Sequence, residues 1–195
     1  MISRYTIYMP NCSCSECDRL FPLFPHFTDP NFHFLVAYPR TIQNVSTSVM
    51  SLLGTYPQAS VTTVGFSGGG AVSLLDALFL RMQVVPATTE VKTVSYGMPR
   101  PGNGPFADMV DSVLPGSAKR ICNKKDPYPV VPALSTGYSS PDGEIHIQEN
   151  GNWISCYGHD NGDNHCIAGT VTSINDAVFQ DHSGPYDGIM ISCLG

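Results

Sequence analysis

Charged residues are scarce in this chain. Lys, Arg, Asp and Glu make up 13% of the 195 residues, and 10 basic against 16 acidic side chains give a formal net charge of −6. Because a phosphate-binding surface needs clustered basic side chains, this balance argues against nucleic acid as a partner. Long apolar runs are also missing: none reaches the ~18 residues that a transmembrane helix needs, so we expect no membrane-spanning segment.

The chain also lacks a visible leader, internal repeats and linkers. The apolar stretch within residues 1–10 is too short for the hydrophobic region of a signal peptide. A hydrophobic content of 42% over this length predicts one domain with a sizeable core. We expect residues 1–32 to form an irregular head rich in Cys and Pro, and residues 33–195 to form the folded domain.

The most informative feature that is present is the sequence GFSGG at 65–69. It lies between a β-branched run at 61–64 and an apolar run at 71–82, which predicts a strand, a tight turn and a helix. This is the pattern of a nucleophile elbow, in which glycines make room for a strained serine, here Ser67. The turn would aim the backbone N–H of Gly68 and the helix N-terminus at a developing oxyanion. The alternative is a glycine-rich turn without chemistry.

A serine nucleophile on such an elbow is followed in the chain by an acid and then by a histidine. Asp126 comes shortly after the apolar pair at 121–122, so we expect it on a loop at the C-terminal end of a strand; a plain Asp-Pro turn is the alternative. His182 lies in a loop near the C-terminus and fits the base. The other histidines are His26 and His33, which precede the serine, and His146, His159 and His165, which lie in a polar stretch.

Alternating helix and strand patterns fill the rest of the domain. Ile42, Val45, Val49 and Leu52 recur at steps of three and four and predict an amphipathic helix over 40–56. The other expected helices cover 68–82, 104–114 and 173–180, and the other strands cover 61–64, 91–95, 118–122, 144–147 and the region around 153–154. This alternation is typical of an α/β fold with a parallel sheet.

Four segments in this order resemble the fungal class 3 lipases, a group that includes feruloyl-esterase-like enzymes. They are the serine motif at 65–70, residues 96–107, residues 123–132 and the terminal motif that begins at His182. The resemblance covers about residues 33 to 195 and implies an α/β-hydrolase with a mainly parallel central sheet. Carried over, it implies Ser67 as nucleophile, Asp126 as the acid that orients the base, and His182 as the base.

The chain departs from the family pattern in two places. The family usually has His before the nucleophile and Leu after it, whereas this chain has Phe66 and Gly68. Family members also carry a longer segment before the nucleophile, with early sheet strands, a second oxyanion donor on a Ser or Thr loop, and a lid. We therefore expect an N-terminally truncated member that lacks the early strands and the lid.

Seven cysteines favour an oxidising environment. Cys156 and Cys166 bracket a short polar loop that a disulfide can close, while a zinc site that adds His159 and His165 is the alternative. Cys122, inside an apolar strand, is interpreted as a buried free thiol.

Cys193 occupies the place where family members tie the C-terminus to the N-terminal segment. The implied partner is one of Cys12, Cys14 and Cys17, although these three could also be metal ligands or free thiols. Sequons at Asn11 and Asn44 predict glycosylation and agree with secretory ancestry.

Taken together, the sequence predicts a serine carboxylic-ester hydrolase, a triacylglycerol lipase or an esterase, that forms an acyl-enzyme on Ser67 without a metal or organic cofactor. The resemblance implies a secreted monomer that acts on a lipid or small ester and contacts a lipid interface transiently. Two other hypotheses stay open: a catalytically silent remnant without the second oxyanion donor, and a metal-binding module built on the 156–166 loop.

Overall fold

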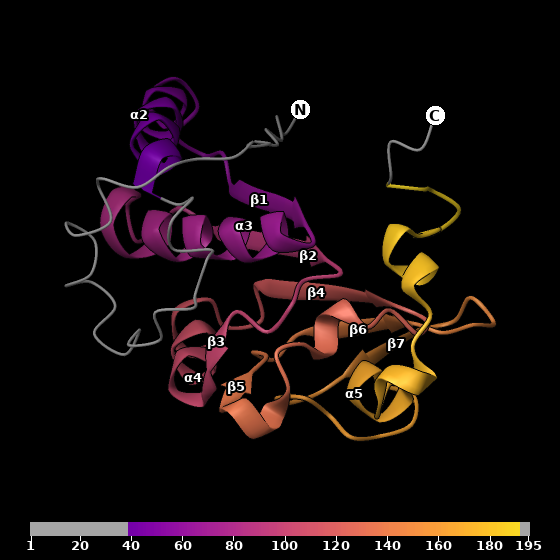
Figure 1. The fold of residues 1–195 in the computed structure, drawn as a ribbon. Helices are drawn as coiled ribbons and strands as arrows, with labels where there is room; N and C mark the ends of the chain where they lie inside the picture. The colour runs from indigo at the N-terminus through magenta and orange to yellow at the C-terminus, as the bar shows by residue number, and fades with distance from the viewer. Residues whose placement is uncertain (1–38, 192–195) are drawn as a thin grey trace.

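The computed structural model describes residues 39–191, with side chains from residue 42 onward (Figure 1). Several expectations therefore lie outside the described residues. These are the Cys- and Pro-rich head, the sequon at Asn11, the two early histidines, and the pairing of Cys193 with Cys12, Cys14 or Cys17.

A five-stranded sheet forms the centre of the fold. Its order is β1 (Val61–Phe66), β2 (Val91–Tyr96), β4 (Ala118–Asn123), β6 (Glu144–Ile147) and β7 (Trp153–Cys156). The first four strands are parallel, and β7 pairs antiparallel with β6 at the edge. All five strands confirm the sequence prediction, to within a few residues at their ends. The carboxyl ends of the four parallel strands consequently lie along one border of the sheet, which runs across the strands.

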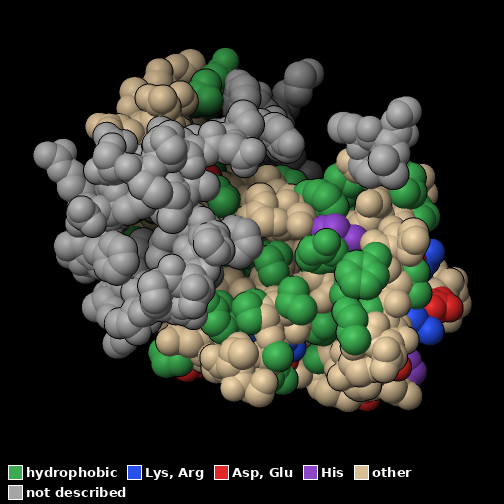
Figure 2. Space-filling model, viewed as in Figure 1, with side chains coloured by type: hydrophobic (Ala, Val, Ile, Leu, Met, Phe, Trp, Pro, Cys, Tyr) green, Lys and Arg blue, Asp and Glu red, His purple; other side chains and the backbone are tan. Residues whose placement is uncertain are grey.

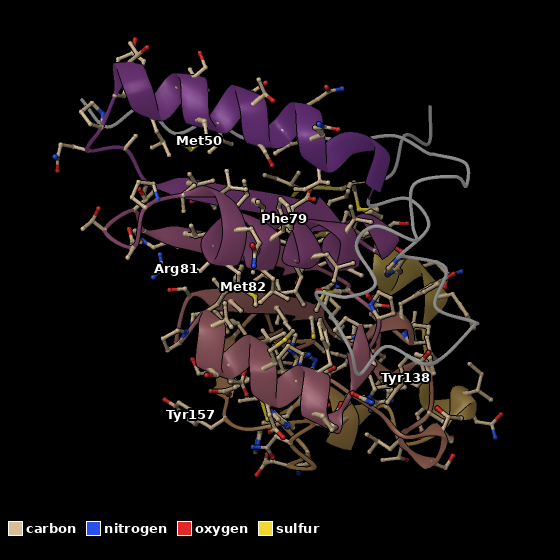
Figure 3. The ribbon with its side chains drawn as sticks, turned by 90° about the vertical axis from the view of Figure 1, so that its left-hand side faces the viewer. Met50, Phe79, Arg81, Met82, Tyr138 and Tyr157 are labelled. Atoms are coloured by element: carbon tan, nitrogen blue, oxygen red, sulfur yellow. A yellow bond between two sulfur atoms is a disulfide. The ribbon has the colours of Figure 1, made fainter. Side chains whose placement is uncertain are left out.

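Three helices carry the apolar faces that cover this sheet. They are α2 (Pro39–Thr55), α3 (Gly68–Phe79) and α4 (Gly104–Val113), and Figures 1 and 3 show them in this order from top to bottom. The amphipathic face of α2 places Val45 and Val49 in the same core as Leu74 and Leu78 of α3 and Val110 of α4. Burial of these faces is the main stabilising contribution to the domain.

Short elements account for most differences from the sequence prediction. The helix expected over 68–82 ends at Phe79 and continues as a π-helical turn, Leu80–Val84. The prediction of one helix over 173–180 is wrong, because Ile174–Asp176 and Phe179–Ser183 are separate 3-10 turns. Five short elements were not predicted. They are the paired strands β3 (Gly102–Asn103) and β5 (Tyr138–Ser139), the one-turn helix α5 (Ile167–Thr170), and the 3-10 turns Tyr128–Val130 and Leu134–Thr136.

Among the described residues, no helix combines the length and the apolar character needed to cross a bilayer.

Candidate active site

Ser67 occupies the sharp turn between β1 and α3. Its backbone has φ 54° and ψ −128°, a conformation that residues with a side chain rarely adopt. Two glycines of the motif allow the turn to close. A Cβ atom on Gly65 would collide with the backbone of Gly69, and one on Gly70 would lie 3.0 Å from Cβ of Ser95. The close approaches explain why this turn needs glycine on both sides of the serine.

The helix that follows starts at Gly68. The first N–H groups of an α-helix have no partner within the helix, and the helix dipole gives this end a partial positive charge. Within residues 39–191, the N–H of Gly68 therefore has no acceptor, and it lies beside Ser67 at a position that suits a negatively charged oxygen.

Ser67, His182 and Asp126 form one hydrogen-bonded row. His182 Nε2 lies 2.9 Å from Ser67 Oγ, and His182 Nδ1 lies 2.9 Å from Asp126 Oδ2. The Asp126 carboxylate is fully buried, while 12% of the His182 side chain is exposed. A neutral imidazole that carries its hydrogen on Nδ1 donates to Asp126 and leaves Nε2 free to accept the hydroxyl proton of Ser67.

Backbone contacts hold the acid and the histidine loop together. Asp126 Oδ1 accepts a 2.9 Å hydrogen bond from the backbone N–H of Tyr128, which fixes the carboxylate. Asp181 is next to His182 in the chain. Its carboxylate accepts a hydrogen bond from the backbone N–H of Lys125 at 3.1 Å, and its backbone carbonyl oxygen accepts one from Asn123 Nδ2 at 2.8 Å. These hydrogen bonds connect the loop that carries Asp126 to the loop that carries His182.

Tyr186 packs beneath these two loops. Its hydroxyl donates to the carbonyl oxygen of His182 at 3.2 Å. Burial raises the pKa of Tyr186 well above its ordinary value, and the negative charge of Asp126 raises it further. The hydroxyl consequently stays protonated and remains a donor.

Two residues that the sequence analysis did not single out shape the site. Gly97 has φ +57°, and a Cβ atom on it would lie 2.8 Å from His182 Nδ1 and 2.9 Å from Asp126 Oδ2. Arg100 is buried and donates to the carbonyl of Pro132 at 2.7 Å and to Asp160 at 2.8 Å, and so fixes the segment after the acid. Both lie in the 96–107 segment that carries the family resemblance, but their roles depend on contacts across loops.

The other described histidines have partners away from Ser67. His146 is buried, and its two ring nitrogens face the carbonyl oxygens of His165 and Lys124 at 2.7 and 2.8 Å. His159 lies 2.6 Å from a carboxylate oxygen of Asp111, and the ring of His165 lies 2.8 Å from Asp163. Of the histidines in residues 42–191, His182 is the one that contacts the serine.

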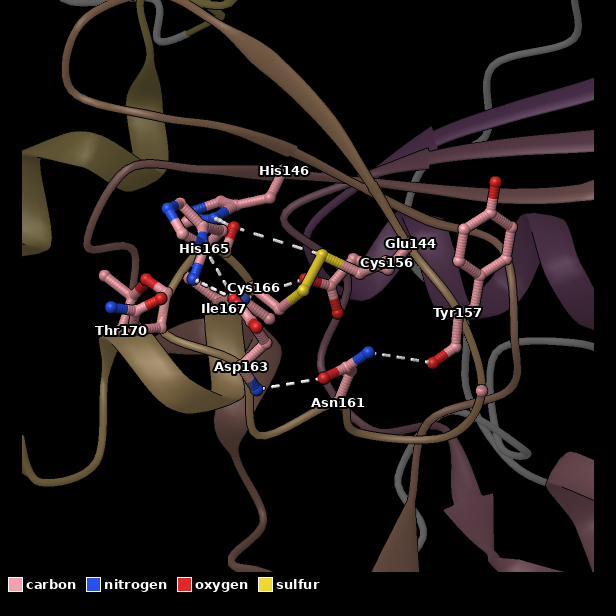
Figure 4. Close-up of a disulfide and its surroundings, with 12 residues drawn as sticks. Glu144, His146, Cys156, Tyr157, Asn161, Asp163, His165, Cys166, Ile167 and Thr170 are labelled. Carbon is pink, nitrogen blue, oxygen red and sulfur yellow. Dashed lines mark hydrogen bonds and ion pairs between the residues drawn. A yellow bond between two sulfur atoms is a disulfide. The ribbon is translucent and has the colours of Figure 1, made fainter.

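Cys156 and Cys166 are joined in a disulfide, with their Cα atoms 5.9 Å apart (Figure 4). Glu144 lies beside them, but its carboxylate accepts hydrogen bonds from Arg120 Nη2 at 3.2 Å and from the Ile167 N–H at 2.8 Å. Because both sulfur atoms are bonded to each other, neither is available as a thiolate ligand, and the zinc alternative loses its two cysteines. Cys122 is a buried free cysteine, and burial raises the pKa of its thiol, which keeps it unreactive.

Comparison with known proteins finds one matching family. The sequence model described as Lipase (class 3) matches residues 17–136. A secreted mono- and diacylglycerol lipase of Malassezia globosa is 29% identical over 169 residues, which cover 87% of this chain and 54% of that protein. Secreted mono- and diacylglycerol lipase 2 of Gibberella zeae is 32% identical over 156 residues, which cover 72% of this chain and 37% of that protein.

Solved structures give the same result. Lipase II from Rhizopus niveus superimposes with a TM-score of 0.70 at 29% identity and covers 83% of this chain and 60% of that one. The lipase from Rhizopus microsporus var. chinensis gives a TM-score of 0.66 at 28% identity, with 80% and 53% covered. The chain thus spans about half the length of the curated relatives it matches.

Proposed function

Because the chain belongs to the class 3 lipase family and has the α/β-hydrolase fold, we propose that it is a serine hydrolase of carboxylic esters. The observation that carries the proposal is the hydrogen-bonded row of Ser67, His182 and Asp126 beside the free N–H of Gly68. Ser67 is the nucleophile, His182 the base and Asp126 the acid that orients it.

In the proposed reaction, His182 Nε2 takes the hydroxyl proton while Ser67 Oγ attacks the ester carbonyl. The Gly68 N–H donates to the oxyanion, and Asp126 stabilises the imidazolium. The imidazolium then gives its proton to the departing alcohol, which leaves an acyl-enzyme on Ser67. Water then gives a proton to His182 as its oxygen attacks the acyl carbonyl. The bond from the acyl carbon to Ser67 Oγ breaks, the imidazolium returns its proton to Ser67 Oγ, and the carboxylic acid product leaves.

Acylglycerols are the substrate class that we propose. The names of the curated relatives describe mono- and diacylglycerol lipases. The surroundings of His182 support this choice, since the exposed ring of Tyr128 stacks on it and the exposed ring of Phe179 contacts Tyr128. Figure 2 shows hydrophobic side chains gathered on one face of the molecule. Such a surface suits transient contact of a monomer with a lipid interface.

Secretion is also part of the proposal. The relatives are described as secreted, and the disulfide between Cys156 and Cys166 fits an oxidising environment.

Fatty-acid release from a mono-, a di- and a triacylglycerol with the same acyl chain tests this function. We expect the wild-type protein to hydrolyse the mono- and diacylglycerol, and Ser67→Ala to hydrolyse none of the three. Asp126→Asn should lower kcat by roughly 10⁴-fold, since it favours the wrong tautomer of the histidine. A wild-type protein that folds, as judged by circular dichroism, but releases no acid would contradict the proposal and favour the silent remnant.

A further inference from the structure

Two aromatic rings lie against the imidazole of His182. The ring centroid of Tyr128 is 3.9 Å from that of His182, with 26° between the planes. The centroid of Phe66 is 4.7 Å away, with 31° between the planes. A ring that lay beside the imidazole in the same plane would have its centroid farther away. Both rings therefore stack on a face of the imidazole and do not contact only its edge.

The two rings occupy opposite faces of the imidazole. Two six-membered rings at these distances cannot share one face of a five-membered ring without interpenetrating. His182 is therefore stacked between Phe66 and Tyr128, while its two nitrogens point in the ring plane toward Ser67 and Asp126.

The two aromatic residues are connected to the other residues of the row, Phe66 to Ser67 and Tyr128 to Asp126. Phe66 is the last residue of β1, directly before Ser67, and its ring also meets Tyr186 edge-on at 6.5 Å. Tyr128 donates its backbone N–H to Asp126 Oδ1 and carries its ring over His182. The positions of serine, acid and imidazole are thereby linked through two rigid side chains.

We propose that Phe66 and Tyr128 are positioning residues for His182, and this inference rests on the proposed function. Their rings restrict rotation of the imidazole out of the plane that joins Ser67 Oγ and Asp126 Oδ2. Their π faces also stabilise the imidazolium, because a cation over an aromatic face is attracted by the ring quadrupole. Since the positive charge exists only after proton transfer, the stabilisation favours the transition state over the bound substrate.

Kinetics on a soluble short-chain ester, 4-nitrophenyl butyrate, test the inference. Tyr128→Leu removes the π face, and we expect kcat to fall roughly 3- to 30-fold with KM little changed. Tyr128→Phe keeps the ring and should recover the loss. Tyr157→Leu is the control, because Tyr157 is the most exposed of the large hydrophobic side chains among the described residues, and its carbonyl oxygen accepts a hydrogen bond from Asn161 and not from the three residues of the row. A rise in KM at constant kcat would overturn the inference and make Tyr128 a substrate contact.

A second measurement does not depend on activity. Stacked rings shift the Cε1–H resonance of His182 upfield, and His182→Gln identifies that resonance by its loss. We expect the resonance to move downfield in Tyr128→Leu and in Phe66→Leu, and to stay in Tyr128→Phe. An unmoved resonance in both Leu variants would show that the rings do not stack on His182. If the resonance moves but the wild-type protein hydrolyses no ester, the stacking stands and the proposed function fails.

Discussion

At the scale of single residues, the absence of a side chain at Gly97 is as important to the site as the three polar side chains. The backbone of Gly97 passes under the contact between His182 Nδ1 and Asp126 Oδ2. The sequence places this glycine in the segment 96–107 that resembles the family. It does not show that this segment runs beneath the hydrogen-bonded row of Ser67, His182 and Asp126. A residue whose role is to leave space is visible only when its neighbours across the fold are known.

Gly97→Ala should strongly lower the proposed ester hydrolysis. The added methyl group would lie 2.8 Å from His182 Nδ1, so the imidazole must shift, and the backbone at φ +57° disfavours alanine in addition. We expect kcat to fall by roughly 100-fold, the cost of a misplacement of about 1 Å. Gly116→Ala is the control, because Gly116 also has a positive φ, +66°, but has open space around it. Equal activity of the two variants would contradict this account of the site.

Asp76 is a buried carboxyl group on α3 that the proposed reaction does not use. Its Oδ1 has no hydrogen-bond partner among the described residues, and burial raises its pKa from 3.8 to about 7. The folded protein therefore holds this proton more tightly than the unfolded chain does. The contribution of Asp76 to stability is most favourable below pH about 4, declines as the pH rises from about 4 to about 7, and is constant above that.

Asp76→Leu should remove this pH dependence. We expect the variant to be more stable than the wild type at pH 8 and to lose that advantage progressively toward pH 4. Urea unfolding of both proteins at pH 4, 6 and 8 measures the difference. A difference that is the same at all three pH values would show that the carboxyl group is not buried as a neutral acid.

At the scale of elements, long and strongly patterned segments were predictable and short ones were not. The helix α2 and the strand β1 have apolar residues at their own periodicity, so the sequence is sufficient to predict them. Residues 173–180 carry apolar side chains at similar spacing, and Ser173 and Asp176 form a capping box that favours a helix start. The chain nevertheless becomes extended at Ala177, and the N–H of Val178 donates to the carbonyl oxygen of Lys125 at 2.9 Å. A hydrogen bond to a distant segment of the chain thus takes the place of the next helical turn, which local propensity does not reveal.

The disulfide closes the loop that follows β7, and its removal should destabilise the domain. Closing a loop of about ten residues stabilises a fold by roughly 2–3 kcal/mol in the chain-entropy model. We expect the double variant Cys156→Ser, Cys166→Ser to lose about this much free energy of unfolding in urea and to be insensitive to reductant. Cys122→Ala is the control, since its cysteine is free and the disulfide remains. A wild-type protein whose unfolding does not respond to reductant would contradict a stabilising role for the disulfide.

At the scale of the whole molecule, the position of the site follows from the parallel sheet. Ser67 follows β1 and Asp126 follows β4, so both lie at the edge where the parallel strands end. His182 reaches the same edge from the last 3-10 turn of the described chain. The sequence predicted the three as one site from the elbow motif, the strand before Asp126, the chain order and the family resemblance, whereas the helix expected before His182 is replaced by 3-10 turns. The stacking of Phe66 and Tyr128 on His182 was not predictable, since it depends on distances between loops.

The most direct test of the account is to identify the residue that a fluorophosphonate labels. We expect the native protein to carry one adduct on the peptide that contains Ser67, because the hydrogen bond from Ser67 Oγ to His182 Nε2 prepares this hydroxyl for attack. Labelling should be lost in Ser67→Ala, fall strongly in His182→Ala and remain in Ser48→Ala, whose serine lies exposed on α2. Peptide mass spectrometry identifies the labelled residue. An adduct that persists in Ser67→Ala, or a folded wild-type protein that takes up no label, would contradict the central claim.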